Sequence, residues 1–141
     1  MKVIILVGPP GTGKSTIAKQ YFPDYVRISQ DDLGKETATK RYIESLEAGK
    51  NVLVDRCNVS KEQRQPWVNL AIQAGADSIS CFALEVSEEE CVARVHERQT
   101  HPTIPAETPL DKKREIVYNF FKSYEPPTIW EGFSSITFLR N

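Results

Sequence analysis

The sequence predicts an α/β domain of three layers, in which helices cover both faces of a parallel sheet. Two observations support this prediction. Short, almost wholly apolar segments alternate along the chain with segments of helical pattern, and strands that are apolar on both sides are typical of parallel sheets buried between helices. The length of 141 residues suits one such unit, so residues 1–141 are expected to form a single domain.

The expected strands are five short apolar segments, at residues 3–7, 26–29, 51–55, 78–86 and 136–139. The first contains an apolar run that is too short for a signal peptide or a membrane span, so we expect it to be a buried strand. The fourth, SISCFALEV, is almost wholly apolar. Together these segments predict a parallel five-stranded sheet.

The expected helices lie between the strands, and residues that favour helix starts and stops mark their ends. In chain order these residues are Gly13, Gly49, Ser60, Gly75, and Ser87 with Glu90 as a capping box. Because Pro66 lies inside the third helix, we expect that helix to be kinked or to begin late. A last helix is expected over residues 110–124, after a proline-rich loop at residues 100–109.

The composition is that of an ordinary globular protein, with 40% hydrophobic and 26% charged residues. A net charge of −1 gives no global attraction to nucleic acid, so any such binding needs a local basic face. The cysteines Cys57, Cys81 and Cys91 form no CxxC pair, and two of them have apolar neighbours, which indicates buried small hydrophobes and a reducing compartment. We therefore expect a cytoplasmic or otherwise intracellular protein without a membrane segment or an obligatory protein partner.

The segment GPPGTGKS, at residues 8–15, matches the phosphate-binding loop pattern G-x-x-x-x-G-K-[ST], directly after a strand and opening a helix. Its glycines let backbone N–H groups point at phosphate, and the helix N-terminus adds positive potential. The sequence therefore predicts ATP or GTP binding and a P-loop NTPase or kinase fold. The expected nucleotide-binding residues of this segment are Gly8, Pro10, Gly11, Thr12, Gly13, Lys14, Ser15 and Thr16.

Three residues are expected to handle the phosphates and the metal. Lys14 would reach the β- and γ-phosphates, and the Ser15 hydroxyl would bind Mg²⁺. Asp55 ends an apolar strand, as a carboxylate that helps to hold Mg²⁺ would. Aspartates at strand ends are also common turn residues, but the phosphate loop favours the metal hypothesis for Asp55.

Asp31 and Asp32 follow the second strand, in the segment ISQDDLG. The carboxyl ends of strands face the ligand crevice in such sheets, so Asp31 can accept a proton from a hydroxyl that attacks the γ-phosphate. The alternative is that both aspartates cap the next segment, and this alternative is favoured for Asp32.

The chain resembles the polynucleotide 5′-hydroxyl kinase family of P-loop phosphotransferases, and it is similar to the kinase-like domain of plant proteins that carry an aprataxin-like domain. The matching segments run in family order and are GPPGTGKST, SQDDLG, VDRCNVSKEQR, the arginine pair in ARVHER, and YEPPTIWEGFSSI. The resemblance implies that Asp31 is the general base for the 5′-hydroxyl. Gln30 stands where the family typically carries arginine, and Arg56 stands where it commonly carries a small polar residue.

Arg94 and Arg98 lie four residues apart on one helix and therefore share a face. The resemblance implies a helical lid in which an R-x-x-x-R motif stabilises the transferred phosphoryl group, so both arginines are expected to bind nucleotide and Arg98 to be catalytic. The alternative is a solvated helix face on which the arginines pair with Glu90 and Glu97.

Basic and aromatic residues are candidates for contacts with the acceptor. The basic candidates are Arg41, Arg56, Lys61, Arg64, Lys112, Lys113 and Arg114. Trp67, Trp130 and Phe133 could stack on a base, although such residues more often belong to the core.

The sequence therefore predicts an ATP-dependent kinase that phosphorylates the 5′-hydroxyl end of DNA or RNA, with Mg²⁺ as cofactor and other nucleoside triphosphates as alternative donors. Such an enzyme would serve nucleic-acid end repair, in functional connection with a phosphatase or ligase. The alternatives are a kinase for a small-molecule hydroxyl, such as a nucleoside, sugar or antibiotic, and a non-catalytic ATP-binding module.

Overall fold

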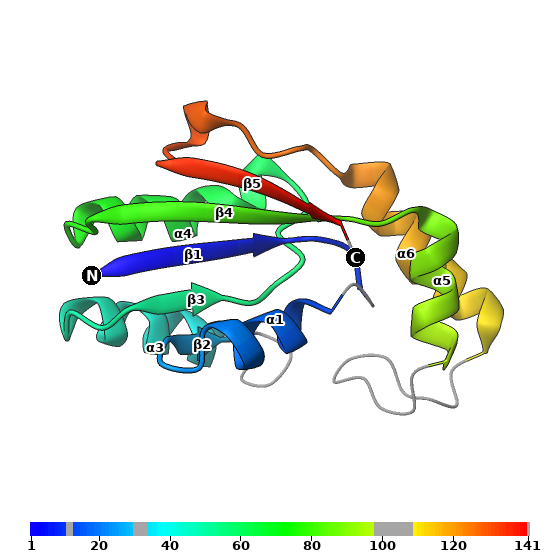
Figure 1. The fold of residues 1–141 in the computed structure, drawn as a ribbon, viewed down its shortest axis with the longest axis horizontal. Helices are drawn as coiled ribbons and strands as arrows, with labels where there is room; N and C mark the ends of the chain where they lie inside the picture. Colours follow the sequence, from blue (N-terminus) through cyan, green and yellow to red (C-terminus); the bar gives the residue numbers. More distant parts are fainter. Residues whose placement is uncertain (11–12, 30–33, 98–108, 141) are drawn as a thin grey trace.

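The computed structural model describes residues 1–10, 13–29, 34–97 and 109–140, and five strands within these residues form one parallel sheet (Figure 1). The strands are β1 (Lys2–Val7), β2 (Val26–Ile28), β3 (Val52–Val54), β4 (Ser78–Glu85) and β5 (Ser135–Arg140). Their order across the sheet is β2-β3-β1-β4-β5, and every neighbouring pair is parallel. The predicted fold class is confirmed.

Helices follow the strands in the expected places. They are α1 (Lys14–Tyr21), α3 (Lys35–Glu47), α4 (Lys61–Gln73), α5 (Glu88–Glu97) and α6 (Leu110–Ser123), with a short 3₁₀ helix η1 (Ile129–Glu131) before β5. The expectation that α4 begins late is wrong. It begins at Lys61, where the Ser60 side chain accepts a hydrogen bond from the Gln63 backbone N–H at 3.2 Å. Pro66 lies in the second turn, where its missing N–H removes one helical hydrogen bond.

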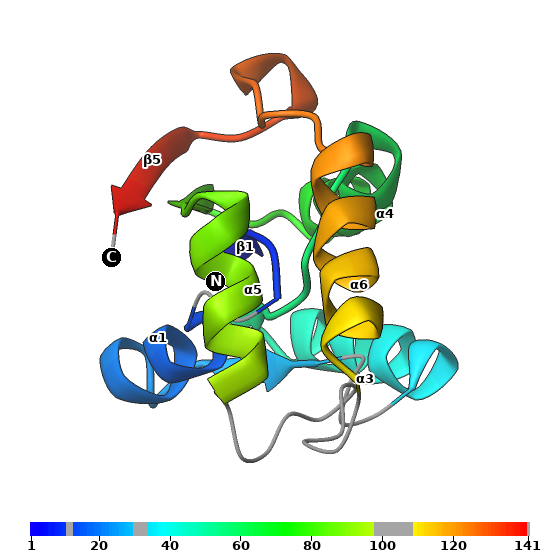
Figure 2. The same ribbon diagram turned by 90° about the vertical axis from the view of Figure 1, so that its right-hand side faces the viewer.

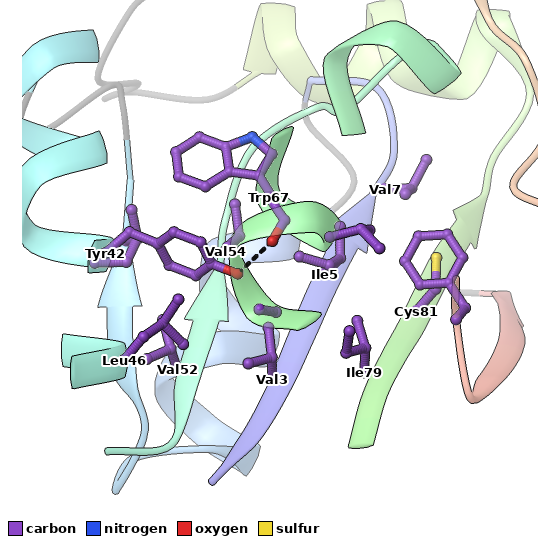
Figure 3. Packing of buried hydrophobic residues seen from close by; sticks show 14 of the residues in the cluster. Val3, Ile5, Val7, Tyr42, Leu46, Val52, Val54, Trp67, Ile79 and Cys81 are labelled. Atoms are coloured by element: carbon purple, nitrogen blue, oxygen red, sulfur yellow. Dashed lines mark hydrogen bonds between the residues drawn. The ribbon is translucent and has the colours of Figure 1, made fainter. Parts of the chain in front are cut away.

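The two faces of the sheet carry separate apolar cores. On one face α3 and α4 pack over β1, β3 and β4 (Figures 1 and 2). Tyr42 and Trp67 meet there edge to face, and the Tyr42 hydroxyl donates a 2.7 Å hydrogen bond to the Trp67 carbonyl (Figure 3). On the other face α1 packs through Ala18 against Ile4 and Leu53. Helices on both faces explain why β3, and β1 after Lys2, are apolar and buried.

The helices α5 and α6 lie side by side beyond the carboxyl ends of the strands (Figures 1 and 2). They pack on each other through Cys91 and Val117, which form a third, smaller apolar cluster. Cys91 is completely buried, and burial raises the pKa of its thiol to about 11, against the opposing effect of the Lys14 charge. Pro9 and Glu90 line one pocket, so α5 lies close to the phosphate loop.

The cysteines are free thiols, and two of them are core residues as expected. Burial raises the pKa of Cys81 to about 12, so this thiol stays protonated at neutral pH and packs as a small hydrophobe. Among the described residues, no helix has the length and apolar character that crossing a membrane requires.

Gly132 provides a test of the packing between η1 and α4. Its φ is +110°, and a Cβ there would meet Val68 Cγ1 at 2.8 Å and Ile72 Cδ1 at 3.3 Å. Gly132→Ala is therefore expected to lower the free energy of unfolding by about 3 kcal/mol, through backbone strain and overpacking together. The measurement is urea unfolding.

Gly49→Ala is the matched control, because Gly49 has φ +71° with nothing within 4 Å of the added Cβ. This variant has the backbone strain without the overpacking, so its free energy of unfolding should fall by about 1 kcal/mol. Equal losses for the two variants would contradict the close approach of η1 to α4.

Candidate active site

The phosphate loop joins β1 to α1 at the carboxyl edge of the sheet (Figure 1). Gly13 has φ +90° and stands at the N-cap of α1 without a side-chain hydrogen bond. Only glycine adopts this backbone conformation readily, and the first N–H groups of the helix are thus left for an anion. Gly11 and Thr12 lie outside the described residues, whereas Gly8, Pro10 and Thr16 flank this turn.

Lys14 folds back over the phosphate loop. Its Nζ donates hydrogen bonds to the carbonyl oxygens of Gly8 at 3.0 Å and Pro9 at 2.9 Å, and the residue is 9% exposed. Two of the three ammonium N–H groups are used in this way. The loop therefore holds a positive charge at its own backbone, where a phosphate chain would lie.

Ser15 and Asp55 meet at the start of α1. The Ser15 hydroxyl donates a 3.1 Å hydrogen bond to Asp55 Oδ2, and Asp55 is 4% exposed. Asp55 directly follows β3, and β3 is the neighbour of β1 in the sheet. The two residues predicted as metal ligands are thus brought together from positions 40 residues apart.

This pair of oxygens suits Mg²⁺. Neighbouring ligands of an octahedral Mg²⁺ ion lie about 2.9 Å apart, close to the 3.1 Å between Ser15 Oγ and Asp55 Oδ2. The described part of the chain contains no cluster of three or more His, Cys, Asp or Glu side chains that could hold a metal. Ser15 and Asp55 would therefore hold Mg²⁺ together with phosphate oxygens and water, as is usual for this ion.

Arg27 is a member of the site that the sequence did not reveal. From β2, its Nε donates a 2.7 Å hydrogen bond to Asp55 Oδ2, and its Nη2 donates a 3.1 Å hydrogen bond to Ser15 Oγ. The feature that could have indicated this role is a charged residue at the centre of a three-residue strand, VRI. The guanidinium thus contacts both oxygens that are expected to bind the metal.

The segment after β3 supports the phosphate loop from behind. The Gly8 N–H donates to the Cys57 carbonyl at 3.1 Å, and Asn58 Nδ2 donates to the Leu6 carbonyl at 2.7 Å. Asn58 has φ +49°, a conformation that asparagine tolerates better than most residues. These hydrogen bonds fix the end of β1 at the point where the loop begins.

Arg64 holds Asn58 and is fully buried. Its Nη1 donates to the Asn58 carbonyl at 2.8 Å, and its Nε and Nη2 donate to the two carboxylate oxygens of Glu131 at 2.7 and 3.2 Å. The hypothesis that Arg64 contacts acceptor phosphate is therefore wrong. Lys113 is corrected in the same way, because it is 1% exposed.

The remaining acceptor candidates differ in exposure. Arg41, Lys61, Lys112 and Arg114 are exposed, and Arg56 is half-buried with its guanidinium 5.4 Å from the centre of the Trp67 ring. Trp67 and Phe133 belong to the core, whereas Trp130 is 90% exposed. Of the three aromatic candidates, only Trp130 has the exposure that stacking on a base requires.

Asp31 and Arg98 lie outside the described residues, as do Gln30 and Asp32. The Asp55 N–H donates to the Ile28 carbonyl at 2.8 Å, so the end of β2, three residues before Asp31 in the sequence, lies beside Asp55. Arg94 is half-buried on α5, four residues before Arg98.

Comparisons with known proteins relate the chain to phosphoryl-transfer proteins. A model of the AAA domain family, AAA_33, matches residues 3–127. The chain is 35% identical over 141 residues to the bifunctional polynucleotide phosphatase/kinase of Schizosaccharomyces pombe, an alignment that covers 96% of this chain and 32% of that protein. It is 31% identical over 147 residues to transcription factor bHLH140 of Arabidopsis thaliana, covering 96% of this chain and 16% of that protein. The chain thus spans about a third or less of these relatives.

A gluconokinase from Sinorhizobium meliloti 1021 has a similar fold, with a TM-score of 0.66, 18% identity, and coverage of 99% of this chain and 82% of that one.

The buried Arg64–Glu131 pair yields a test of the support behind the phosphate loop. Glu131→Gln removes the negative charge that faces the Arg64 guanidinium, and the Arg64 side chain is 0% exposed. We expect the free energy of unfolding to fall by about 3–5 kcal/mol, because an uncompensated charge is left in the interior. Urea unfolding measures this loss.

Glu85→Gln is the control, because the Arg140–Glu85 pair is exposed and should contribute less than about 1 kcal/mol. The double variant Arg64→Met/Glu131→Leu should lose less free energy of unfolding than the sum of the losses of Arg64→Met and Glu131→Leu. Additive losses would contradict direct coupling between Arg64 and Glu131.

Proposed function

Because this chain belongs to the AAA domain family of P-loop proteins, we propose that it is an ATP-dependent polynucleotide 5′-hydroxyl kinase. It transfers the γ-phosphate of ATP to the 5′-hydroxyl end of DNA or RNA. Phosphoryl transfer is supported by the Lys14 ammonium, which bonds the backbone of the phosphate loop, and by the contact of the next residue, Ser15, with Asp55. The acceptor class rests on the similarity to the bifunctional polynucleotide phosphatase/kinase of fission yeast.

The phosphate loop binds and orients the nucleotide. The N–H groups at the start of α1 and the Lys14 ammonium hold the β- and γ-phosphates. Ser15 and Asp55 would hold Mg²⁺, which would neutralise phosphate charge. The Ser15 and Asp55 oxygens already lie 3.1 Å apart, so the chain itself sets the spacing of this oxygen pair.

Asp31 acts on the acceptor. It accepts the proton of the 5′-hydroxyl as that oxygen forms a bond to the γ-phosphorus, and the bond from this phosphorus to the β–γ bridging oxygen breaks to release ADP. Support comes from the path of the chain, which leaves β2 at Ile28 beside Asp55. Arg98, with Arg94 on α5, stabilises the charge on the transferred group.

The proposed activity belongs to nucleic-acid end repair. A 5′-phosphate is the end that a ligase requires, and a blocked 3′ end requires a phosphatase, so the chain would act with such enzymes. The similar yeast protein is named as both phosphatase and kinase, and this chain covers 32% of it.

The first experiment is transfer of labelled γ-phosphate from Mg-ATP to 5′-hydroxyl oligonucleotides of DNA and RNA. Oligonucleotides that already carry a 5′-phosphate are the matched acceptor control and should remain unlabelled. Absence of transfer to both 5′-hydroxyl acceptors, with ATP still bound, would exclude the polynucleotide acceptor and favour a small-molecule hydroxyl. ATP binding without consumption in the presence of any acceptor would favour a non-catalytic module.

Asp31→Asn tests the general base. The amide cannot accept the proton, so turnover should fall by about 10²–10⁴-fold, while ATP affinity measured by calorimetry stays nearly unchanged. Asp32→Asn is the neighbouring control and should have a smaller effect. An active Asp31→Asn variant, or a larger effect of Asp32→Asn, would show that Asp31 is not the general base.

Arg98→Ala tests the lid. Arginines that stabilise the transferred phosphoryl group contribute about 10³–10⁵ to turnover, so a loss of this order is expected in single-turnover transfer. Arg140→Ala is the control, because Arg140 is an exposed residue of β5. Near wild-type turnover of Arg98→Ala would remove this residue from the catalytic group.

A further inference from the structure

Arg27 occupies the position at which Ser15 and Asp55 meet. Its backbone pairs with Leu53 in β3, and Leu53 belongs to the cluster under α1. The side chain is 21% exposed and reaches Asp55 Oδ2 at 2.7 Å and Ser15 Oγ at 3.1 Å. One guanidinium therefore contacts the two atoms that fit a divalent cation.

We propose that Arg27 is the resident counter-cation of Asp55, and that a divalent metal ion must displace its guanidinium in order to bind. This inference deepens the proposed function, since it rests on the assignment of Ser15 and Asp55 as metal ligands. Arg27 is thus a positioning residue that controls metal entry.

Burial requires Asp55 to have a cation. The residue is 4% exposed, and a buried carboxylate without a partner is costly. The guanidinium meets this need without a metal, because arginine stays protonated in proteins. When the metal arrives, its positive charge replaces that of Arg27, so Asp55 is compensated in both states.

The two cations exclude each other. Both would contact Asp55 Oδ2 and Ser15 Oγ. Two positive charges on the same pair of oxygens repel each other strongly in a buried site. Mg²⁺ also gives up its water reluctantly. A metal ion alone therefore competes poorly with Arg27, whereas one that arrives with nucleotide brings phosphate oxygens as further ligands. The nucleotide-free chain should bind divalent cations weakly.

The experiment measures Mn²⁺ binding to the nucleotide-free 141-residue chain by electron paramagnetic resonance. Arg27→Gln removes the competing charge, and we expect it to bind Mn²⁺ about tenfold more tightly or better. Arg140→Gln is the matched control, because the Arg140 guanidinium bonds the exposed Glu85 at 3.2 Å instead of Ser15 or Asp55. It should bind Mn²⁺ as the wild type does.

The gain should depend on Asp55. In an Asp55→Asn background, Arg27→Gln should bring no increase in Mn²⁺ affinity. Equal affinity of the wild type and Arg27→Gln, or a gain that persists with Asp55→Asn, would overturn the proposal. These outcomes do not depend on an acceptor, so they stand apart from a failure of kinase activity.

The wild-type chain offers a second readout should Arg27→Gln not fold. The Arg27 Nε–H group should give a distinct ¹H–¹⁵N resonance while it is bonded to Asp55. Adding MgCl₂ at low millimolar concentration should leave this resonance in place, and adding ADP with MgCl₂ should shift it or expose it to solvent exchange. An unchanged resonance after Mg-ADP has bound would also overturn the proposal.

Discussion

The buried ion pair between Arg64 and Glu131 is the interaction on which the geometry of this site depends. Glu131 belongs to η1, near the carboxyl end of the chain. It bonds Arg64, which also donates a hydrogen bond to the Asn58 carbonyl. Asn58 in turn fixes the Leu6 carbonyl at the end of β1. A buried ion pair contributes little net stability, but this one fixes the position of the loop that binds phosphate.

The remaining geometry follows from the order of strands. Because β2, β3 and β1 are neighbours and all parallel, the residues at or beyond their carboxyl ends meet at one edge of the sheet. Ser15 comes from the helix after β1, Asp55 follows β3, and Arg27 extends from β2. Three segments that are distant in sequence thus supply one oxygen pair and one cation.

The sequence predicted the parts of this arrangement that local chemistry determines. Apolar strands and the phosphate-loop pattern led to the fold, and a strand-end aspartate led to the meeting of Ser15 with Asp55. The partner of Arg64 could not be predicted, because Glu131 lies 67 residues away and its segment has no pattern that identifies an ion pair. In the sequence, Arg64 therefore resembled a surface arginine, and Arg27 resembled an ordinary strand residue.

The helices α5 and α6 share an apolar cluster of their own. Their cluster around Cys91 and Val117 is distinct from the two cores of the sheet, and among the described residues Tyr124 at the end of α6 packs on the larger core. A rotation of this pair about Tyr124 and the short link at Val86 would leave the contacts inside each cluster unbroken. Such hinged motion has a small energetic cost, because it leaves both packed interiors intact. Arg94 would travel with this body, while Lys14, Ser15 and Asp55 stay fixed to the sheet.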